Sequence, residues 1–229
     1  MPERAPDLHV VFDLDDTLYP ERDYALSGFR AAARWAEAEL GIAGLDADMT
    51  RLLDAGHLGQ LFGMALAQRK PDHAPEHLQG LLAAYRDHEP VLTLFPDAAA
   101  VLDRLAGRVK LGLITDGHHP TQMTKVRALA LAPRFAEIVY TQALGGRAYH
   151  KPHPRSYEIV EAALGRPGDR FVYVGDNPSK DFVTPNARGW TSVMIERPGR
   201  IHAGAQVAAG GAPQHTVRAL TELPAVLGL

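Results

Sequence analysis

A chain of 229 residues can build one large hydrophobic core, or a main domain with a smaller companion. Hydrophobic residues make up 46% and charged residues 22%, which is typical of a globular protein and unlike a disordered chain. The net charge of -3 argues against a chain built to bind nucleic acid or an anionic membrane. The absence of cysteine excludes disulfides, thiolate catalysis and cysteine-ligated metal centres.

The first residues do not look like a targeting signal. The segment MPERAPDLHVVFDLDD carries charges before and inside its apolar run, whereas a signal peptide needs an uninterrupted hydrophobic region. No stretch approaches the roughly 18 apolar residues of a membrane span. We therefore expect a cytoplasmic protein with no membrane partner.

The chain begins with one expected strand and then becomes helical. Residues 8–14 (LHVVFDL) form a valine-rich run that ends in carboxylates, a pattern typical of a buried parallel strand. Apolar residues at helical spacing then predict helices over residues 24–40, 52–66 and 74–85, with breaks near Gly56 and Pro71. We expect no strand in this region.

Strands and helices alternate after Pro96. We expect strands over residues 109–115, 138–141, 170–174 and 191–195. We expect helices over residues 97–107, 119–131, 154–164, 179–188 and 217–227, with a loop over residues 203–213. This alternation predicts an α/β protein with a doubly wound parallel sheet. The expected domains are a core of residues 1–19 and 91–229 and an all-helical insert of residues 20–90.

Polar side chains gather at three of the expected strand ends. They are DLDDT at residues 13–17, TDG at residues 115–117 and GDN at residues 175–177, and Lys151 lies between the last two. Ligands of open parallel sheets bind outside the carboxyl ends of the strands, so we expect these segments to meet in one site.

The residue types at these ends suit phosphate chemistry. Asp13 and Asp15 share one side of an extended segment, where two carboxylates repel unless a cation lies between them. Asp176 adds a third carboxylate and Asp181 a fourth, and a site rich in oxygen suits a hard ion such as Mg²⁺. The Thr115 hydroxyl, the N–H groups of Asp116 and Gly117, and the Lys151 ammonium can bind phosphate oxygens. The set fits phosphoryl transfer through an aspartyl-phosphate.

These motifs also resemble those of a known family. DxDxT at residues 13–17, a strand-terminal Thr115, Lys151 and GDxxxxD at residues 175–181 occur in the order seen in the haloacid dehalogenase-like (HAD) hydrolase superfamily. The resemblance covers residues 8–195 and implies a Rossmann-like core with a small helical C1 cap inserted after the first strand. Only about 35 residues separate Thr115 from Lys151, which leaves no room for a large cap at that second position.

The resemblance implies a role for each motif residue. Asp13 is the expected nucleophile, and Asp15 first protonates the leaving oxygen and then activates water. Thr115, Asp116 and Lys151 are expected to bind the phosphate. Magnesium is the expected cofactor, held by Asp13, the backbone carbonyl of Asp15, Asp176 and Asp181. Dehalogenases of the family lack the second acid, because a halide needs no proton, so Asp15 favours a phosphatase.

Residues 115–131 (TDGHHPTQMTKVRALAL) further resemble the branch that holds pyrimidine 5'-nucleotidases and N-acylneuraminate-9-phosphatases. Asp116 replaces the asparagine that is usual in that branch. The expected partner is a small phosphate ester, such as a nucleoside monophosphate or a sugar phosphate, rather than a nucleic acid polymer. The sequence leaves the particular ester and the oligomeric state open.

Two other functions remain open at this point. A sugar-phosphate phosphomutase of the same superfamily would carry the same core motifs. A binding protein that has lost catalysis should lack a nucleophile or a metal ligand, whereas Asp13, Asp15, Lys151 and Asp176 are all present.

Several polar or aromatic residues have a simpler interpretation than a catalytic one. Asp16 should point away from the site, and Asp116 should act through its backbone alone. Four histidines are expected to line the rim of the site or to lie on the surface: His118, His119, His150 and His153. Lys125 and Arg127 are expected to form a solvated helix face. Phe29, Trp35 and Phe62 are expected to fill the core of the helical insert.

Overall fold

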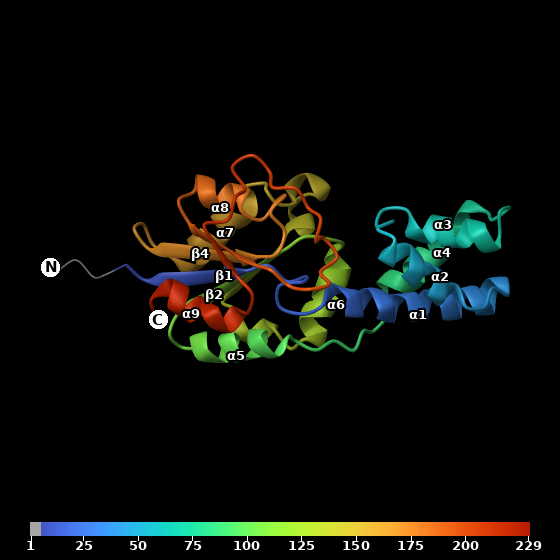
Figure 1. Ribbon diagram of the computed structural model, residues 1–229, viewed down its shortest axis with the longest axis horizontal. Helices are drawn as coiled ribbons and strands as arrows, with labels where there is room; N and C mark the ends of the chain where they lie inside the picture. Colours follow the sequence, from blue (N-terminus) through green and yellow to red (C-terminus); the bar gives the residue numbers. More distant parts are fainter. Residues whose placement is uncertain (1–5) are drawn as a thin grey trace. The chain divides into compact units, whose positions relative to one another are not determined.

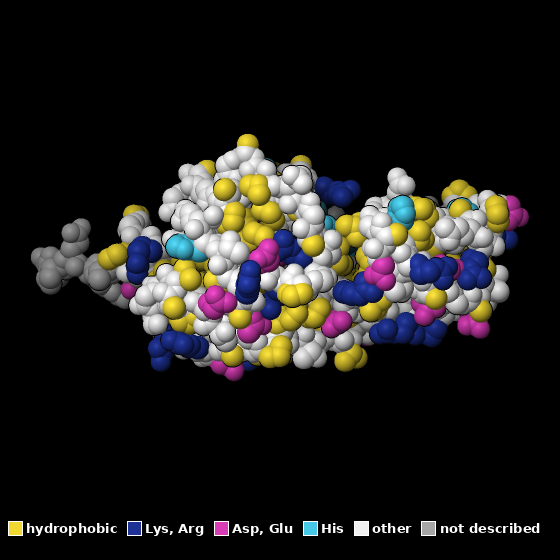
Figure 2. All heavy atoms as spheres, viewed as in Figure 1, with side chains coloured by type: hydrophobic (Ala, Val, Ile, Leu, Met, Phe, Trp, Pro, Cys, Tyr) yellow, Lys and Arg dark blue, Asp and Glu magenta, His cyan; other side chains and the backbone are white. Residues whose placement is uncertain are grey.

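The computed structural model describes residues 6–229 (Figure 1). The chain divides into two compact units. The core unit comprises the residues up to Glu21 together with Leu92–Leu229, and the helical unit comprises Arg22–Val91. Among the described helices, none combines the length and the apolarity that a bilayer crossing requires. On the face seen in Figure 2, basic and acidic side chains are interspersed.

Within residues 6–229, six strands form one parallel sheet in the core unit. They are β1 (Leu8–Phe12), β2 (Lys110–Thr115), β3 (Glu137–Tyr140), β4 (Arg170–Gly175), β5 (Thr191–Ile195) and β6 (His215–Val217). Their order is β3-β2-β1-β4-β5-β6, and every neighbouring pair is parallel. The chain runs outward from β1 to β3 and then returns to the other side of β1, which creates a topological switch point there. The predicted α/β sheet is confirmed.

Helices cover both faces of this sheet (Figure 1). The α-helices of the core unit are α5 (Pro96–Leu105), α6 (His119–Ala128), α7 (Arg155–Leu164), α8 (Val183–Ala187) and α9 (Leu223–Leu227). Four short 3₁₀ turns connect them: η1 (Ala132–Arg134), η2 (Thr141–Leu144), η3 (Arg147–Tyr149) and η4 (Leu220–Glu222). In Figure 1, α7 and α8 lie on one face of the sheet, and α5 and α9 lie on the other.

The last part of the chain differs from the expectation. A helix was predicted over residues 217–227, but Val217 ends β6 and is buried against the sheet. The α-helix begins only at Leu223, because the Glu222 carboxylate accepts hydrogen bonds from the N–H groups of Arg218 and Ala219 and so forms a turn first. The sixth strand is only three residues long, which is too short to give a period-2 signal.

The predicted helix over residues 179–188 is also wrong at its start, because α8 begins at Val183. The Asn177 side-chain oxygen accepts hydrogen bonds from the Ser179 N–H at 3.0 Å and from the Ser179 hydroxyl at 2.6 Å. This side chain competes with helical bonding and holds the segment after β4 in turns. Pro185 falls in the first turn of the shortened helix, where an N–H has no intrahelical partner to lose.

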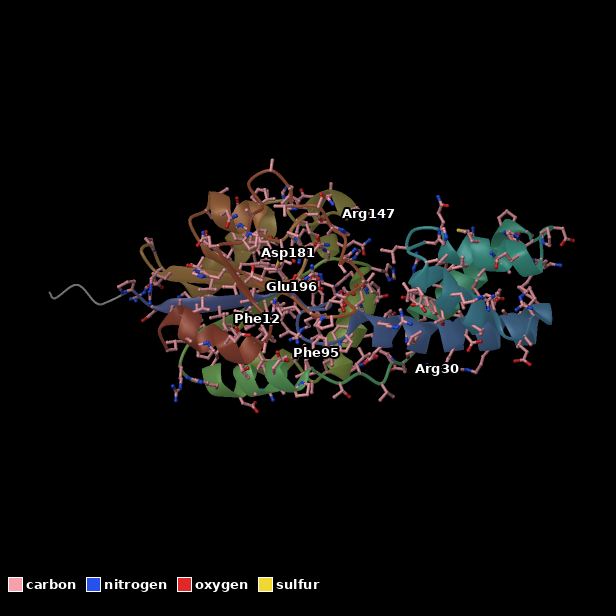
Figure 3. All side chains as sticks on the ribbon, viewed as in Figure 1. Phe12, Arg30, Phe95, Arg147, Asp181 and Glu196 are labelled. Carbon is pink, nitrogen blue, oxygen red and sulfur yellow. The ribbon has the colours of Figure 1, made fainter. Side chains whose placement is uncertain are left out.

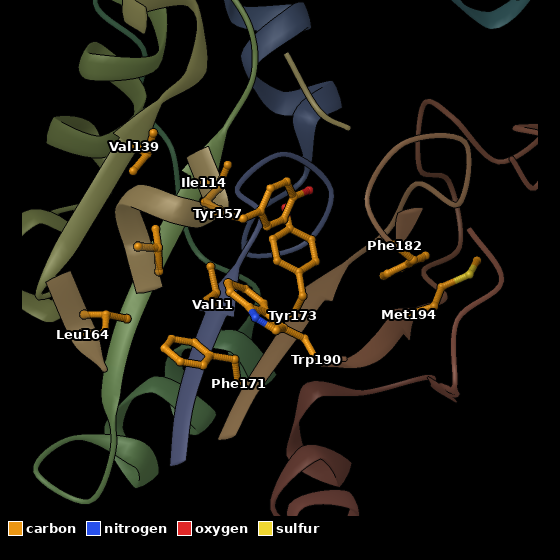
Figure 4. Close-up of a cluster of buried hydrophobic side chains, with 11 residues drawn as sticks. Val11, Ile114, Val139, Tyr157, Leu164, Phe171, Tyr173, Phe182, Trp190 and Met194 are labelled. Carbon is orange, nitrogen blue, oxygen red and sulfur yellow. The ribbon is translucent and has the colours of Figure 1, made fainter. Parts of the chain in front are cut away.

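A cluster of aromatic and aliphatic side chains fills one face of the sheet (Figure 4). Phe171 and Trp190 stack with their ring centroids 4.7 Å apart, and Tyr157 and Tyr173 approach to 5.5 Å. The side chains come from β1, β2, β3, β4, β5, α7 and the segments around α8. This cluster fixes β4 and α7 beneath the carboxyl ends of the strands.

The helical unit contains α1 from Arg22 onward, α2, α3 and α4. Their bounds are α1 (Glu21–Leu40), α2 (Leu45–Asp54), α3 (Leu61–Arg69) and α4 (Pro75–Arg86). The break expected near Gly56 is confirmed, because Gly56, at a φ of 84°, lies between α2 and α3. The expected start at residue 52 is wrong, because α2 begins at Leu45. Phe29 packs edge-to-face on Phe62 at 5.7 Å, which agrees with their interpretation as core residues of this unit.

Asp169 ties the opposite edge of the core unit together. Its carboxylate accepts hydrogen bonds from His9 Nε2 at 3.1 Å, from the Asp7 N–H at 3.0 Å and from the Arg166 N–H at 2.9 Å. The side chain is only 4% exposed. These bonds, led by the one from His9, lower the pKa of Asp169 to about 2. They join the start of β1 to the start of β4.

We therefore expect Asp169→Asn to lower the stability of the protein at pH 7. A carboxyl whose pKa is lowered on folding stabilises the folded state above its ordinary pKa, and this stabilisation is lost as the pH falls toward 2. The difference in the free energy of unfolding between wild type and variant should thus become smaller as the pH falls below about 4. Urea unfolding at pH 7, 4 and 3 measures this difference, and the variant Asp103→Asn, at an exposed position, is the control. A gap that widens at low pH would refute the assignment.

Candidate functional site

The predicted site residues meet at the carboxyl edge of the sheet. Phe12 of β1 is level with Leu113 of β2 and with Val174 of β4, so the three strands end at the same height. The Asp13 N–H donates to the Val174 carbonyl at 2.8 Å. A cavity of about 310 Å³ opens there, and its lining includes Asp13, Asp15, Asp116, Lys151 and Asp176. Parallel strand pairing thus brings together segments that lie far apart in the sequence.

A larger hollow of about 620 Å³ lies at the other edge of the sheet, beside α7 and the starts of β4 and β5. Its charged groups largely pair with one another, as Arg188 does with Glu161. The Trp190 indole also donates to Glu161. No group of carboxylates like that of the smaller cavity occurs among its lining residues, so the smaller cavity is the better candidate for chemistry.

Three buried carboxylates of this edge lie close enough to share a cation. Asp13, Asp176 and Asp181 each offer an oxygen, and these oxygens lie within 4.8 Å of one another. Burial, with the neighbouring carboxylates, raises the pKa of Asp13 to about 7 and that of Asp176 to about 9. Within residues 6–229, Asp176 Oδ2 is buried without a hydrogen-bond partner. The oxygen donors and their uncompensated charge fit a hard divalent cation.

Gly175 and Asn177 set the place of Asp181. The Asp181 carboxylate accepts a hydrogen bond from the Asn177 N–H at 3.0 Å. A Cβ on residue 175 would lie 2.5 Å from Asp181 Oδ2, so only glycine lets this carboxylate fold back against the end of β4. The spacing of the GDxxxxD segment therefore has a steric reason.

Lys151 is completely buried between two of these carboxylates. Its Nζ lies 2.5 Å from Asp13 Oδ1 and 2.8 Å from Asp181 Oδ1, and it donates to the Tyr173 hydroxyl at 3.0 Å. Burial lowers the pKa of Lys151, but Asp13 and Asp181 outweigh this effect and raise it well above its usual value. Lys151 thus carries a fixed positive charge beside Asp13, as the sequence predicts.

The Asp116 carboxylate has more contacts than expected. It accepts hydrogen bonds from the Thr141 hydroxyl at 2.8 Å, from the Lys151 N–H at 3.0 Å and from Lys180 Nζ at 2.9 Å. Burial alone would raise its pKa, but Lys151 and Lys180 hold the pKa of Asp116 well below its usual range. The expectation that Asp116 acts through its backbone alone is wrong, because its side chain positions the Lys151 loop and Lys180.

Asp15 is held by a separate set of donors. Lys125 Nζ lies 2.7 Å from Asp15 Oδ1, the Tyr19 hydroxyl donates to the same oxygen at 2.5 Å, and Gln122 donates to Oδ2 at 2.9 Å. Burial raises the pKa of Asp15, but the Lys125 charge and these hydrogen bonds together lower it. The Asp15 carboxylate does not join the acidic cluster, so its backbone carbonyl alone is left for a metal role.

The interpretation of Lys125 as part of a solvated helix face is therefore wrong. Lys125 is 3% exposed, and with Gln122 three residues earlier it faces the sheet from α6. Gln122 also donates to the Thr115 hydroxyl at 2.5 Å, which leaves that hydroxyl free to donate to a ligand. Both residues lie in the segment that resembles the nucleotidase branch, and that resemblance is the one signal that could have indicated them.

Two further carboxylates have contrasting positions. Asp16, at a φ of 53°, does not line the cavity, and its oxygens accept hydrogen bonds from the Glu21 and Ile201 N–H groups. It points away from the site, as expected. Glu21 does line the cavity, and burial with the nearby Asp15 and Asp16 raises the pKa of Glu21 to about 8. No pattern in the sequence indicated Glu21.

The four histidines near the predicted loops lie in different environments in the structure. His150 lines the cavity, and so does His202, which the sequence did not indicate. His118 contacts the Thr121 hydroxyl at 3.1 Å, and the rings of His119 and Tyr140 lie 5.1 Å apart. His153 lies beside Tyr149.

Comparison with known proteins gives one family. The model of the haloacid dehalogenase-like hydrolases matches residues 8–182. Glyceraldehyde 3-phosphate phosphatase of Methanopyrus kandleri is 30% identical over 82% of this chain and 83% of that protein. N-acylneuraminate-9-phosphatase of Rattus norvegicus is 33% identical over 59% of this chain and 52% of that protein. The crystal structure of a 2-haloacid dehalogenase from Pseudomonas syringae matches with a TM-score of 0.62 and 25% identity, over 97% of this chain and 98% of that one.

The acidic cluster yields a prediction about stability. A carboxyl whose pKa is raised on folding costs stability as the pH rises from about 4 to about 9, and a bound cation removes this cost. We expect cation-free Asp176→Asn to melt at a higher temperature than the cation-free wild type at pH 8. Magnesium should stabilise the wild type, by about 2.7 kcal/mol at a hundred times its dissociation constant, and not the variant.

Differential scanning calorimetry with chelator or with Mg²⁺ measures both effects. Asp103→Asn, on the surface of the core unit, is the control and should respond to Mg²⁺ as the wild type does. Equal stabilisation of Asp176→Asn and wild type by Mg²⁺ would place the cation elsewhere.

Proposed function

The chain belongs to the haloacid dehalogenase-like hydrolase family, and we propose that it is a Mg²⁺-dependent phosphatase of small phosphate monoesters. One observation carries the proposal: two carboxylates in one cavity have opposite environments. Asp13 lies among buried carboxylates and Lys151, whereas Asp15 is held by Lys125, Gln122 and Tyr19. The donors around Asp15 favour its ionised form, which can accept the proton of a water molecule, and Lys151 offsets part of the cost of burying the Asp13 carboxylate.

In the first step Asp13 would attack phosphorus while the bond from phosphorus to the ester oxygen breaks. Asp15 in its protonated form, which the second step restores, gives its proton to the leaving oxygen, and this oxygen departs as an alcohol. Lys151, the Thr115 hydroxyl and the N–H groups of Asp116 and Gly117 would hold the phosphate oxygens. In the second step water attacks the phosphoaspartate, Asp15 accepts the proton of that water, and Asp13 is restored as inorganic phosphate leaves.

Asp13, Asp176, Asp181 and the Asp15 carbonyl would hold the magnesium ion. When bound, it supplies the positive charge that lets carboxylates and phosphate share one cavity. The residues of the chain provide the remaining positive charge. Lys151 is the buried cation nearest to Asp13, and its contact with Tyr173 connects it to the aromatic cluster below.

The site also argues against carbon–halogen cleavage, despite the likeness to a haloacid dehalogenase structure. A halide leaves without a proton, so dehalogenation needs no acid beside the nucleophile. Here Asp15 is half-buried two residues after Asp13, and Tyr19, Gln122 and Lys125 donate to its carboxylate, so a group that can transfer a proton is held in place. The named phosphatases among the relatives support the same choice, and they suggest a sugar phosphate or a shorter phosphorylated metabolite as substrate.

The test of the function is turnover of phosphate monoesters with Mg²⁺. We expect release of phosphate from a panel of phosphorylated metabolites and from p-nitrophenyl phosphate, and no release of halide from 2-haloalkanoates. Asp13→Asn should lower kcat by at least about 10⁴-fold while the thermal unfolding remains cooperative, because an amide cannot form the acyl phosphate. Halide release by the wild type, or kcat retained by Asp13→Asn, would overturn the proposal.

Lys125 gives a sharper test of Asp15. The p-nitrophenolate leaving group needs no proton, so hydrolysis of the phosphoaspartate should limit the turnover of p-nitrophenyl phosphate. With this substrate, kcat therefore measures the step in which Asp15 acts as a base. Lys125→Met removes the charge that most lowers the pKa of Asp15. The acid limb of the kcat profile should move to higher pH, with kcat at pH 6 reduced by about 10-fold to 100-fold.

The matched variants are Lys125→Arg, which keeps the charge, and Arg127→Met, which removes a charge from the exposed side of the same helix. Both should keep the acid limb near its wild-type position. An unchanged acid limb in Lys125→Met would mean that Lys125 serves folding alone.

A further inference from the structure

The cations around the catalytic cavity are not equally engaged. Lys151 contacts Asp13 and Asp181, and Lys180 contacts Asp116. Arg147 also lines the cavity, but its side chain has no ion-pair or hydrogen-bond partner anywhere in residues 6–229. Its side chain extends from the surface of the core unit (Figure 3). A guanidinium that lines this cavity and has no carboxylate partner can bind an anionic group of a ligand.

The backbone around Arg147 holds it in a defined place. Gly145 and Gly146 have φ values of 148° and 86°, and η3 follows them directly. A Cβ on residue 145 would lie 2.5 Å from the Tyr149 ring, and that ring lies 4.6 Å from the ring of His153. The turn is thus packed against its own aromatic residue, which limits the entropy that Arg147 loses on binding a ligand.

His150 provides a second, independent observation. It lines the same cavity, and its Nε2 is buried without a hydrogen-bond partner among the described residues. Burial lowers the pKa of His150; Asp116 raises it, and Lys180, Arg147 and Lys151 lower it again. A buried ring nitrogen without a partner costs free energy unless a ligand or water binds it.

We propose that Arg147 and His150 form a second anion subsite beside the phosphate site, so that the preferred substrates are short phosphate esters with a second acidic group, a carboxylate or a phosphate. This inference rests on the proposed phosphatase function. Arg147 forms a charge-assisted pair with the second anion, and His150 Nε2 donates a hydrogen bond to it.

The carboxylates of the cavity do not oppose a second anion. Asp116 is paired with Lys180, Asp15 with Lys125, and Asp13 with Lys151, and the charge of Asp176 is the one that a bound cation would offset. Glu21 has a pKa raised to about 8, so its carboxyl is largely neutral at pH 7 and can donate a hydrogen bond. The volume of about 310 Å³ lies at the low end for ligand pockets, which suits a short chain between the two anions.

Three matched esters test the inference: 3-hydroxypropyl phosphate, 3-phosphonooxypropanoate and propane-1,3-diyl bisphosphate. They share a three-carbon chain and differ in whether the tail is neutral, a carboxylate or a phosphate. With Mg²⁺ at pH 7, the wild type should hydrolyse at least one of the two anionic-tailed esters with a kcat/KM about 10-fold above that of the neutral one, mainly through KM. The better of the two identifies the second anion.

Arg147→Met should remove this preference, so that the ratio of anionic to neutral kcat/KM falls about 10-fold. Arg147→Lys keeps the charge without the planar fork and should retain part of the ratio. Arg108→Met is the matched control, because Arg108 is exposed just before β2, at the opposite edge of the sheet. Its ratio and its activity should equal those of the wild type.

Binding without turnover separates this inference from the proposed function. Calorimetry with Mg²⁺ should show 4-phosphonobutanoate binding about 10-fold more tightly than 4-hydroxybutylphosphonate, with the difference lost in Arg147→Met. If no ester is hydrolysed but this difference persists, the phosphatase proposal fails and the subsite stands. The subsite is refuted if the wild type shows no preference, if Arg147→Met weakens all ligands equally, or if Arg108→Met has the same effect.

Discussion

The buried contact of Lys151 with Asp13 and Asp181 is the interaction on which the site depends. Burial at the end of one sheet disfavours the charged form of a carboxylate, and neighbouring carboxylates also repel, so the pKa values of Asp13 and Asp176 are raised first by burial and then by this repulsion. Without Lys151, Asp13 would lose its nearest positive charge and would remain protonated at neutral pH. In the proposed reaction, the ammonium would keep Asp13 available as a nucleophile, and the remaining negative charge of the cluster would attract a divalent cation.

The aromatic cluster on the sheet and the loop held by Asp116 both keep Lys151 in place for this contact. Tyr173, part of the aromatic cluster on the sheet, accepts a hydrogen bond from Lys151, so packing in the core fixes the height of the ammonium. The Asp116 carboxylate binds the Lys151 N–H and thereby holds the loop that carries the lysine to the end of β2. Gly175 leaves room for Asp181. Stability and chemistry here use the same residues, so substitutions below the site should affect both.

Much of this could be predicted from the sequence, and the failures have physical causes. Five strands and the carboxylates that follow them were predictable, because buried parallel strands read as apolar runs and their carboxyl ends meet. The strand β6 was missed because three residues carry no periodicity. The start of α8 was misplaced because the Asn177 side chain, rather than helix propensity, decides the turn. Lys125 was assigned to the surface because a lone lysine on a helix usually is exposed, and only the tertiary position of Asp15 reverses this.

The pairing of charges also determines what the cavity can recognise. Lys125 pairs with Asp15, Lys151 with Asp13 and Lys180 with Asp116, so each of these cations already has a carboxylate partner before a ligand binds. In the proposed function, a phosphate group would contact Lys151 and the cation whichever alcohol it is attached to, so this part of the site would not distinguish one ester from another. Discrimination must come from groups left with unused bonding capacity. In the core unit, Arg147 and the Nε2 of His150 are such groups, because no side chain among residues 6–229 pairs with either of them. Specificity on this scaffold then follows from the charges that folding leaves unpaired.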